Sequence, residues 1–286
     1  MLHRCSVYKL VLDMGTALYL AKAFCYHDRQ GRPIPMTQTQ STSFDALRME
    51  FRSYVQELNR RSPWLRDLQE ELRESLGYQD YNVETPIVYN KTLDDFGPTD
   101  QPLFIIVADN PGKNEQKADV QRYLVGQSGK LAKGWFDKEL KLNFYKTCII
   151  INKTPIHTPK TAELGHLRRL AQARSPDLGE ALDLLLEESQ RFMAGLAFRM
   201  HAALDSVLWV SGYGELRQGK LFSTWAQETK KLYANAEPGL RQRLWVFRHF
   251  SMNQFAIEYK KSTYSGEPMD RLAAVGSSNR RRILGW

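Results

Sequence analysis

The stretch LFIIVADNPGK, residues 103–113, decides the fold. It opens with six apolar residues, three of them β-branched, and then changes abruptly to Asp109, Asn110, Pro111 and Gly112. A continuous apolar run of this kind is typical of a strand that is covered on both faces. In open parallel sheets, ligands bind beyond the carboxyl ends of the strands. The stretch therefore predicts a buried strand that delivers polar residues to a site.

Three more apolar runs follow along the chain, at residues 145–152, 206–212 and 244–250. The segments between them have helical periodicity, and we expect helices at 128–142 with Ser128 as its cap, 161–173, 178–204 and 222–236. Alternation of strands and helices favours right-handed crossover connections. The expected fold is therefore α/β, a three-layer α/β/α domain with a four-stranded, mainly parallel sheet.

The segments before and after this alternation of strands and helices suggest that the chain has further parts besides the α/β domain. Polar residues 33–43 have the composition of a linker, and residues 44–61 have helical spacing. Ser62 and Pro63 have the pattern of an N-cap followed by the first residue of another helix. We expect a helical N-terminal extension over 1–85, an α/β domain over 86–260 and a basic C-terminal tail over 261–286, where Arg280–Arg282 are solvated charge or phosphate contacts.

Composition narrows the class of protein. The 286 residues carry a formal charge of +8, which suits either a polyanionic partner or an ordinary basic soluble enzyme. The apolar N-terminal segment 7–26 contains three charged residues, so we expect it to pack in a core rather than span a membrane. Three cysteines, Cys5, Cys25 and Cys148, are too few for a four-cysteine cluster and predict no disulfide framework, hence a reducing compartment.

Common catalytic motifs are absent from the sequence. Gly112–Lys113 and Gly129–Lys130 both lack the rest of a phosphate-binding loop, and no Rossmann fingerprint or G-x-S-x-G elbow occurs. The histidines lack the spacing of a metal site. We therefore expect neither a metal nor a cofactor.

Three polar residues remain, each at or just past the end of an expected strand: Asn110, Asn152 and His249. Any one of them alone is most simply a turn or loop residue. Together at one sheet edge they indicate a site, because amides read a base edge or hold a water and a histidine stabilises an oxygen that gains negative charge. The set contains no nucleophile, which favours hydrolysis by a positioned water.

These segments resemble the uracil-DNA glycosylase superfamily, nearest to the single-strand-selective monofunctional type with family-4-like features. Residues 108–112, ADNPG, are similar to the family's G-M-N-P-G, residues 152–156 to N-x-x-P-L, and residues 249–252 loosely to H-P-S-P. Residues 123–131, YLVGQSGKL, resemble a family-4 run, and residues 88–96 and 160–164 are similar to segments that flank the motifs. The resemblance covers roughly residues 86–260.

The resemblance implies roles for particular residues. Asn110, or Asp109 in its place, orients the attacking water, and His249 stabilises the departing base. Substrate contacts fall on Gly112, Tyr123, Asn152 and Ser251, with Tyr123 either stacking on the base or packing in the core. DNA contacts fall on Lys113, Lys130, Met252 and Asn253. In the family this last loop wedges into the duplex where the base has left. Phe255, which follows Asn253 and Gln254, is either part of that wedge or the first core residue of the next helix.

The chain departs from the family pattern at Ala108 and at Phe250, and it lacks the family-4 cluster cysteines, so no iron–sulfur centre is implied. The expected function is a monofunctional DNA repair glycosylase that hydrolyses the N-glycosidic bond of uracil or a related deaminated base by base flipping and water attack. Two alternatives stay open: a catalytically lapsed DNA-binding relative, and a glycosylase for another base such as hypoxanthine. Expected partners are single- or double-stranded DNA and no membrane, with the protein a monomer in the cytoplasm or nucleoid if bacterial and in the nucleus if eukaryotic.

Overall fold

A computed structural model describes residues 35–286, which form one compact unit. The expected core-packed segment 7–26, and with it Cys5 and Cys25, lies outside the described residues. Cys148 is a free, buried cysteine at the start of a strand, as expected of a small core hydrophobe.

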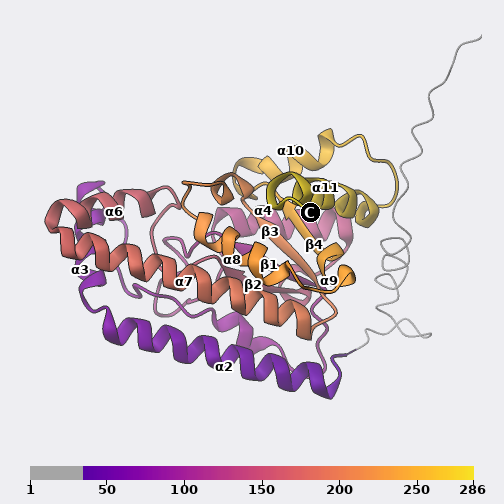
Figure 1. The fold of residues 1–286 in the computed structure, drawn as a ribbon, viewed down its shortest axis with the longest axis horizontal. Coiled ribbons are helices and arrows are strands. Elements are labelled where there is room, and N and C mark those ends of the chain that lie inside the picture. The colour runs from indigo at the N-terminus through magenta and orange to yellow at the C-terminus, as the bar shows by residue number, and fades with distance from the viewer. Residues whose placement is uncertain (1–34) are drawn as a thin grey trace, which may run out of the picture. The chain divides into compact units, whose positions relative to one another are not determined.

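Four parallel strands form the central sheet (Figure 1). They are β1 (Phe104–Ala108), β2 (Cys148–Asn152), β3 (Val207–Ser211) and β4 (Leu244–Phe247), in the order β2-β1-β3-β4. Every strand residue is buried, which explains why the strands are continuous apolar runs. The register pairs Ala108 with Asn152, so the carboxyl ends of β1 and β2 end level with each other.

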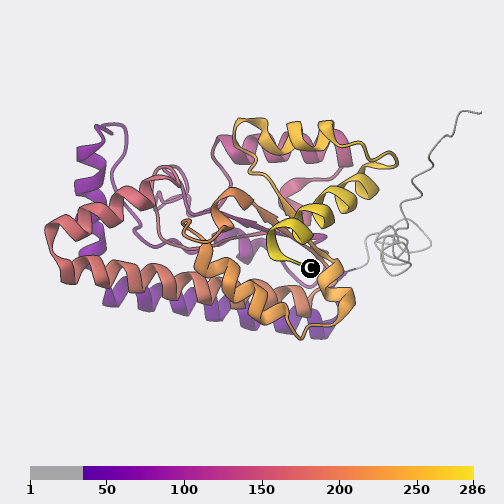
Figure 2. The same cartoon turned by 45° about the horizontal axis from the view of Figure 1, so that its top comes forward.

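Helices cover both faces of the sheet, and Figures 1 and 2 show the three layers that result. On one face lie α2 (Gln38–Arg61), α7 (Pro176–Ala203) and α8 (Ser223–Tyr233). On the other lie α4 (Gln127–Trp135), the π-helix η2 (Phe136–Leu140), α10 (Gln254–Lys261) and α11 (Pro268–Leu284). The remaining elements are α3 (Trp64–Ser75), η1 (Lys91–Asp95), α5 (Phe144–Thr147), α6 (Glu163–Arg174), η3 (Tyr213–Leu216), α9 (Pro238–Gln242) and η4 (Ser251–Asn253). The expected α/β/α architecture is confirmed.

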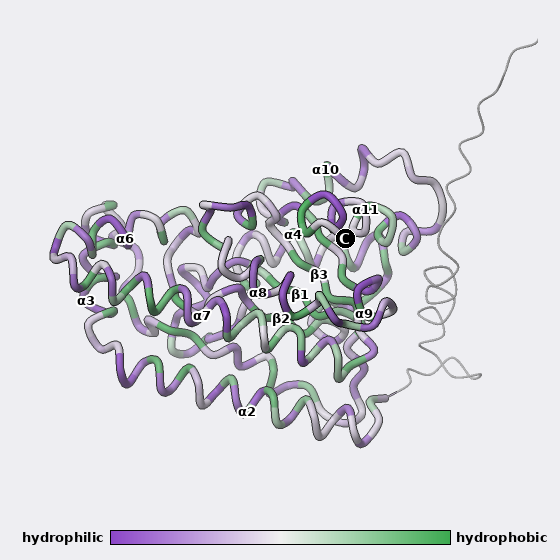
Figure 3. Tube along the Cα trace, in the orientation of Figure 1, coloured by the Kyte–Doolittle hydropathy of each residue, from purple (hydrophilic) through white to green (hydrophobic). Residues whose placement is uncertain are grey.

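Apolar residues concentrate on the strands and on the inner sides of the helices (Figure 3). Trp209 of β3 lies at the centre of one layer, with its ring 4.1 Å from that of Phe247 and 5.5 Å from that of Phe136. Full burial of an aromatic side chain contributes on the order of 2–3 kcal/mol. Phe255 is 1% exposed and belongs to this cluster, so it is a core residue.

The C-terminal segment is a packed helix and not a tail. Helix α11 lies against β4, and a Cβ at Gly276 would come within 2.5 Å of the Trp245 Cβ, so only glycine permits the approach. Arg280 is 8% exposed and donates hydrogen bonds to the main-chain oxygens of Leu244 and Trp286. The expected basic tail over 261–286 was therefore wrong, because one face of the helix completes the core while Arg281 stays exposed.

The N-terminal helices also belong to the same unit. Helix α2 begins inside the expected linker, where Thr37 and Gln40 form a capping box. It packs on α7, with the rings of Tyr54 and Phe192 stacked 3.6 Å apart. Ser62 makes no side-chain cap for α3. Residues 35–85 are thus an integral layer of the domain rather than a separate extension.

One expected helix is divided in two. The segment predicted as 128–142 begins at Gln127, capped by Gly126 rather than by Ser128, and changes from α4 to the π-helix η2 at Phe136. It ends at Leu140, and the next residue, Lys141, has a left-handed φ of 58°. Among residues 35–286, no helix is long and apolar enough to cross a membrane.

Candidate functional site

A cleft of about 930 Å³ opens at the carboxyl edge of the sheet. Its floor is formed by the ends of β1 and β2, and the residues after β3 and β4 form its sides. Crossover connections leave such an edge uncovered, since each chain segment turns away there into a helix. Asn110, Asn152 and His249 all line this cleft, so the fold brings the three together from separate strands.

Asn110 has one side of its amide fixed and the other free. Its Nδ2 donates to the Thr158 Oγ1 at 2.9 Å and to the Ile156 oxygen at 3.3 Å. Its Oδ1 is buried and has no hydrogen-bond partner among the described residues. A fixed amide with an open acceptor suits a ligand group that donates a hydrogen bond, such as a water.

Asn152 is 1% exposed, and neither its Oδ1 nor its Nδ2 has a partner within residues 35–286. Buried side-chain amides are nearly always hydrogen-bonded, because an unpaired one loses its hydration without compensation. An unpaired amide on the floor of a cleft is therefore suited to a ligand that offers one donor and one acceptor side by side.

His249 follows β4, and its ring orientation is set locally. Its Nδ1 accepts a hydrogen bond from the Ser251 amide at 3.0 Å, and the Ser251 hydroxyl lies 2.8 Å from the same atom. Burial lowers the pKa of His249 from its usual value, and Lys153 acts in the same direction, while Asp109 opposes both. The ring is therefore neutral near pH 7 with its proton on Nε2, which makes it a hydrogen-bond donor.

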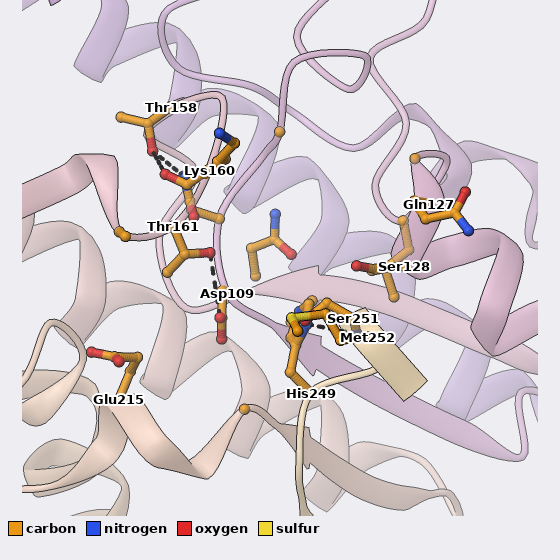
Figure 4. Close-up of a pocket in the computed structure, with 18 of the residues that line it drawn as sticks. Asp109, Gln127, Ser128, Thr158, Lys160, Thr161, Glu215, His249, Ser251 and Met252 are labelled. Atoms are coloured by element: carbon orange, nitrogen blue, oxygen red, sulfur yellow. Dashed lines mark hydrogen bonds between the residues drawn. The ribbon is translucent and has the colours of Figure 1, made fainter. Parts of the chain in front are cut away.

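Asp109 lies on the floor of the cleft in an ion pair that the sequence did not reveal. Its Oδ1 is 2.6 Å from the Nζ of Lys153, a residue with no exposed surface. Its Oδ2 accepts a hydrogen bond of 3.4 Å from Thr161, which Figure 4 shows above Asp109, with His249 and Ser251 to one side. The pair places one fixed carboxylate beside the asparagines.

Glu115 is a second carboxyl group of the cleft that sequence reasoning missed. It is 8% exposed and accepts a hydrogen bond from the Gly112 amide at 3.1 Å. Burial raises the pKa of Glu115 to about 7, although the amides of Gly112 and of residues 124–126 act in the opposite direction. The Gly112 amide, expected to face the substrate, is therefore already occupied by this side chain.

The other expected residues fall in two groups. Gly112, Lys113, Ser251 and Met252 line the cleft, and Lys113 forms an ion pair with Asp80. Tyr123 does not line the cleft: it is fully buried, and its hydroxyl donates to the main-chain oxygen of Val88. The stacking role for Tyr123 was wrong, and the core alternative holds. Lys130 and Asn253 are exposed residues outside the cleft lining.

Residues on the rim have an unusual backbone. Met252 and Asn253 both adopt left-handed conformations, with φ of 53° and 56°. Met252 is 80% exposed, more than any other large apolar side chain among residues 35–286. Non-glycine residues in this region of φ store strain that commonly occurs at functional sites.

Within residues 35–286, no three His, Cys, Asp or Glu side chains lie close enough together to hold a metal ion. Comparison of the chain with protein-family models, with curated proteins and with solved structures finds no match. The case for any function therefore depends on the geometry of the cleft.

Proposed function

We propose that the protein is a DNA glycosylase that hydrolyses the N-glycosidic bond of uracil, or of a related deaminated base, in DNA. The observation that carries the proposal is the buried amide of Asn152, whose two polar atoms have no hydrogen-bond partner in the described part of the chain. It lies in a cleft that also holds the Asn110 Oδ1 and His249. A uracil ring presents an N–H and a C=O side by side on its pairing edge. One side-chain amide satisfies both groups.

In this proposal the target nucleotide leaves the base stack and enters the cleft, at a cost of about a few kcal/mol. Asn152 donates to one uracil oxygen and accepts from the ring N–H. The Asn110 Oδ1 accepts a hydrogen bond from a water that attacks the sugar carbon. The bond between the sugar carbon and the water oxygen forms as the C–N bond breaks. The electron pair of the C–N bond leaves with the base.

The neutral His249 supplies electrostatic help to that step. Its Nε2–H donates to the oxygen of the base that gains negative charge, and such a donor contributes about 10²–10³ in rate. The water's proton passes to Asp109 or to the leaving base. In this proposal Asn152 recognises the base, Asn110 positions the water and His249 stabilises the developing charge.

The net charge of the chain and the rim of the cleft agree with a nucleic-acid substrate. The chain carries a formal charge of +8, which attracts phosphates. Met252 lies exposed on the rim, where an apolar side chain is able to enter the gap that a flipped base leaves.

The test is cleavage of a labelled oligonucleotide with a single uracil, followed by alkali to break abasic sites. We expect product with the wild type and a loss of about 10²-fold or more for Asn110→Ala and for Asn152→Ala. Asn235→Ala, at an exposed asparagine outside the cleft lining, is the matched control and keeps full activity. Equal activity in Asn152→Ala and Asn235→Ala would rule out the recognition role.

Hypoxanthine is a second candidate base, because it also presents an N–H next to a C=O. The amide of Asn152 has no partner among the described residues that fixes its orientation, and a cleft of about 930 Å³ has room for a purine. The same assay with uracil and hypoxanthine, each in single and double strands, decides between them. DNA binding without any cleavage would instead indicate a lapsed relative.

A further inference from the structure

Lys153 is a buried lysine directly beneath the cleft. Its side chain has no exposed surface, and it follows Asn152 at the end of β2. The ammonium group contacts the Asp109 Oδ1 at 2.6 Å and the main-chain oxygens of Ser211 at 2.5 Å and Ala108 at 3.4 Å. It thus joins the carboxyl ends of β1, β2 and β3.

Such burial is unfavourable unless the charge is fully paired, because a lysine loses its hydration. Here all three ammonium donors have acceptors, and the ring of Phe222 lies 5.1 Å from the Nζ. Burial lowers the pKa of Lys153, whereas Asp109 and Glu215 act to raise it. A neutral side chain such as glutamine offers at most two donors and would leave the Asp109 carboxylate without a counter-charge, so the lysine serves the carboxylate as well as the strand ends.

We propose that Lys153 is a positioning residue that fixes the Asp109 carboxylate so that one of its oxygens faces the reacting sugar. The proposal rests on the glycosylase function proposed above. Lys153 occupies the Oδ1 of Asp109, which leaves the Oδ2 toward Thr161 and the cleft. The carboxylate then accepts the proton of the attacking water as the C–O bond forms and the base departs with the electrons of the C–N bond.

The surroundings of the pair support a fixed carboxylate. Gly212 of the loop after β3 has a φ of +79°, and a Cβ there would lie 2.7 Å from the Asp109 Oδ1, so a glycine makes the space that the pair needs. The charged and titratable groups that act on the pair from neighbouring elements are His249 after β4 and Glu215 in η3. Neither replaces Lys153 as a partner, because neither makes a hydrogen bond to Asp109.

The test compares Lys153→Met and Lys153→Gln with wild type on a single-uracil oligonucleotide. Removing the ammonium group lets the Asp109 carboxylate turn, so the attacking water loses its fixed acceptor. We expect kcat to fall at least about tenfold while KM stays within about threefold, since Lys153 does not touch the substrate. Lys230→Met, at an exposed lysine on α8, is the matched control and behaves as wild type.

A second variant separates positioning from folding. Asp109→Asn removes the carboxylate that Lys153 holds, so adding Lys153→Met to it should lower kcat no further. A further loss in the double variant, or an unchanged kcat in both Lys153 variants, would overturn the proposal. A wild type that cleaves no base would instead refute the glycosylase function on which the proposal rests.

Discussion

Gly212 gives the sharpest test of how the floor of the cleft is built. Its φ of +79° belongs to the left-handed region, and an added Cβ would lie 2.7 Å from the Asp109 Oδ1. Gly212→Ala therefore combines two effects: backbone strain, and displacement of a carboxylate that is paired with a buried lysine. Two other glycines separate these effects.

Gly219 has a φ of +74°, but no atom of residues 35–286 would lie within 4 Å of an added Cβ. Gly214 has neither a positive φ nor a close neighbour within the same residues. For an L-residue the left-handed region costs about 1–2 kcal/mol, partly offset by about 0.4–1 kcal/mol from a stiffer unfolded chain. We thus expect Gly219→Ala to lose about 1 kcal/mol of unfolding free energy. Gly214→Ala should stay within about 0.5 kcal/mol of wild type.

Gly212→Ala should lose clearly more, because breaking a buried ion pair costs about 3–5 kcal/mol and even partial displacement adds to the backbone term. We expect a total of at least about 3 kcal/mol, measured by urea unfolding of all three variants in one buffer with equal m-values. If the unfolding free energy of Gly212→Ala lies within about 0.5 kcal/mol of that of Gly219→Ala, the Asp109 carboxylate moves aside at little cost. That result would refute the idea that Asp109 is rigidly held.

Three more predictions follow from the packing and the charges. Gly276→Ala should destabilise the protein by at least about 2 kcal/mol in urea unfolding, because a Cβ would meet Trp245. The control is Gly195→Ala in α7, where a Cβ has open space among residues 35–286, and it should gain up to about 1 kcal/mol. Equal effects of the two substitutions would contradict the close approach of α11 to β4. Since Glu115 has its pKa raised from 4.5 to about 7, the native state holds a proton that the unfolded chain releases, so stability should fall by about 3 kcal/mol as pH rises between these values. Glu115→Gln should remove that part of the pH dependence, and an unchanged slope would show that the carboxyl is ionised throughout. Met252→Ala should leave the unfolding free energy within about 0.5 kcal/mol while lowering cleavage of duplex more than of single-stranded substrate, because the side chain is exposed; an equal loss on both substrates would argue against a wedge.

The sheet and its functional edge could be predicted from the sequence because both depend on local patterns. Residues 103–108 are apolar throughout, as strands buried on both faces must be, and the structure has β1 at Phe104–Ala108. Polar residues at the carboxyl ends of parallel strands lie at the same edge of the sheet, however the intervening helices pack. For this reason the sequence predicts that Asn110, Asn152 and His249 come together, and all three line the cleft.

Tertiary packing decided what no local pattern encodes, because burial depends on segments distant in sequence. Lys153 has the sequence context of a loop lysine, and only the convergence of three strand ends encloses it with Asp109. The family resemblance allowed Tyr123 to stack on the base, yet its hydroxyl is buried and donates to the main-chain oxygen of Val88. The arginine-rich C-terminal segment is an amphipathic helix whose apolar face completes the cover of β4. The sequence thus determined which side chains reach the edge of the sheet, and the packing of distant segments determined which of them are buried, paired or free.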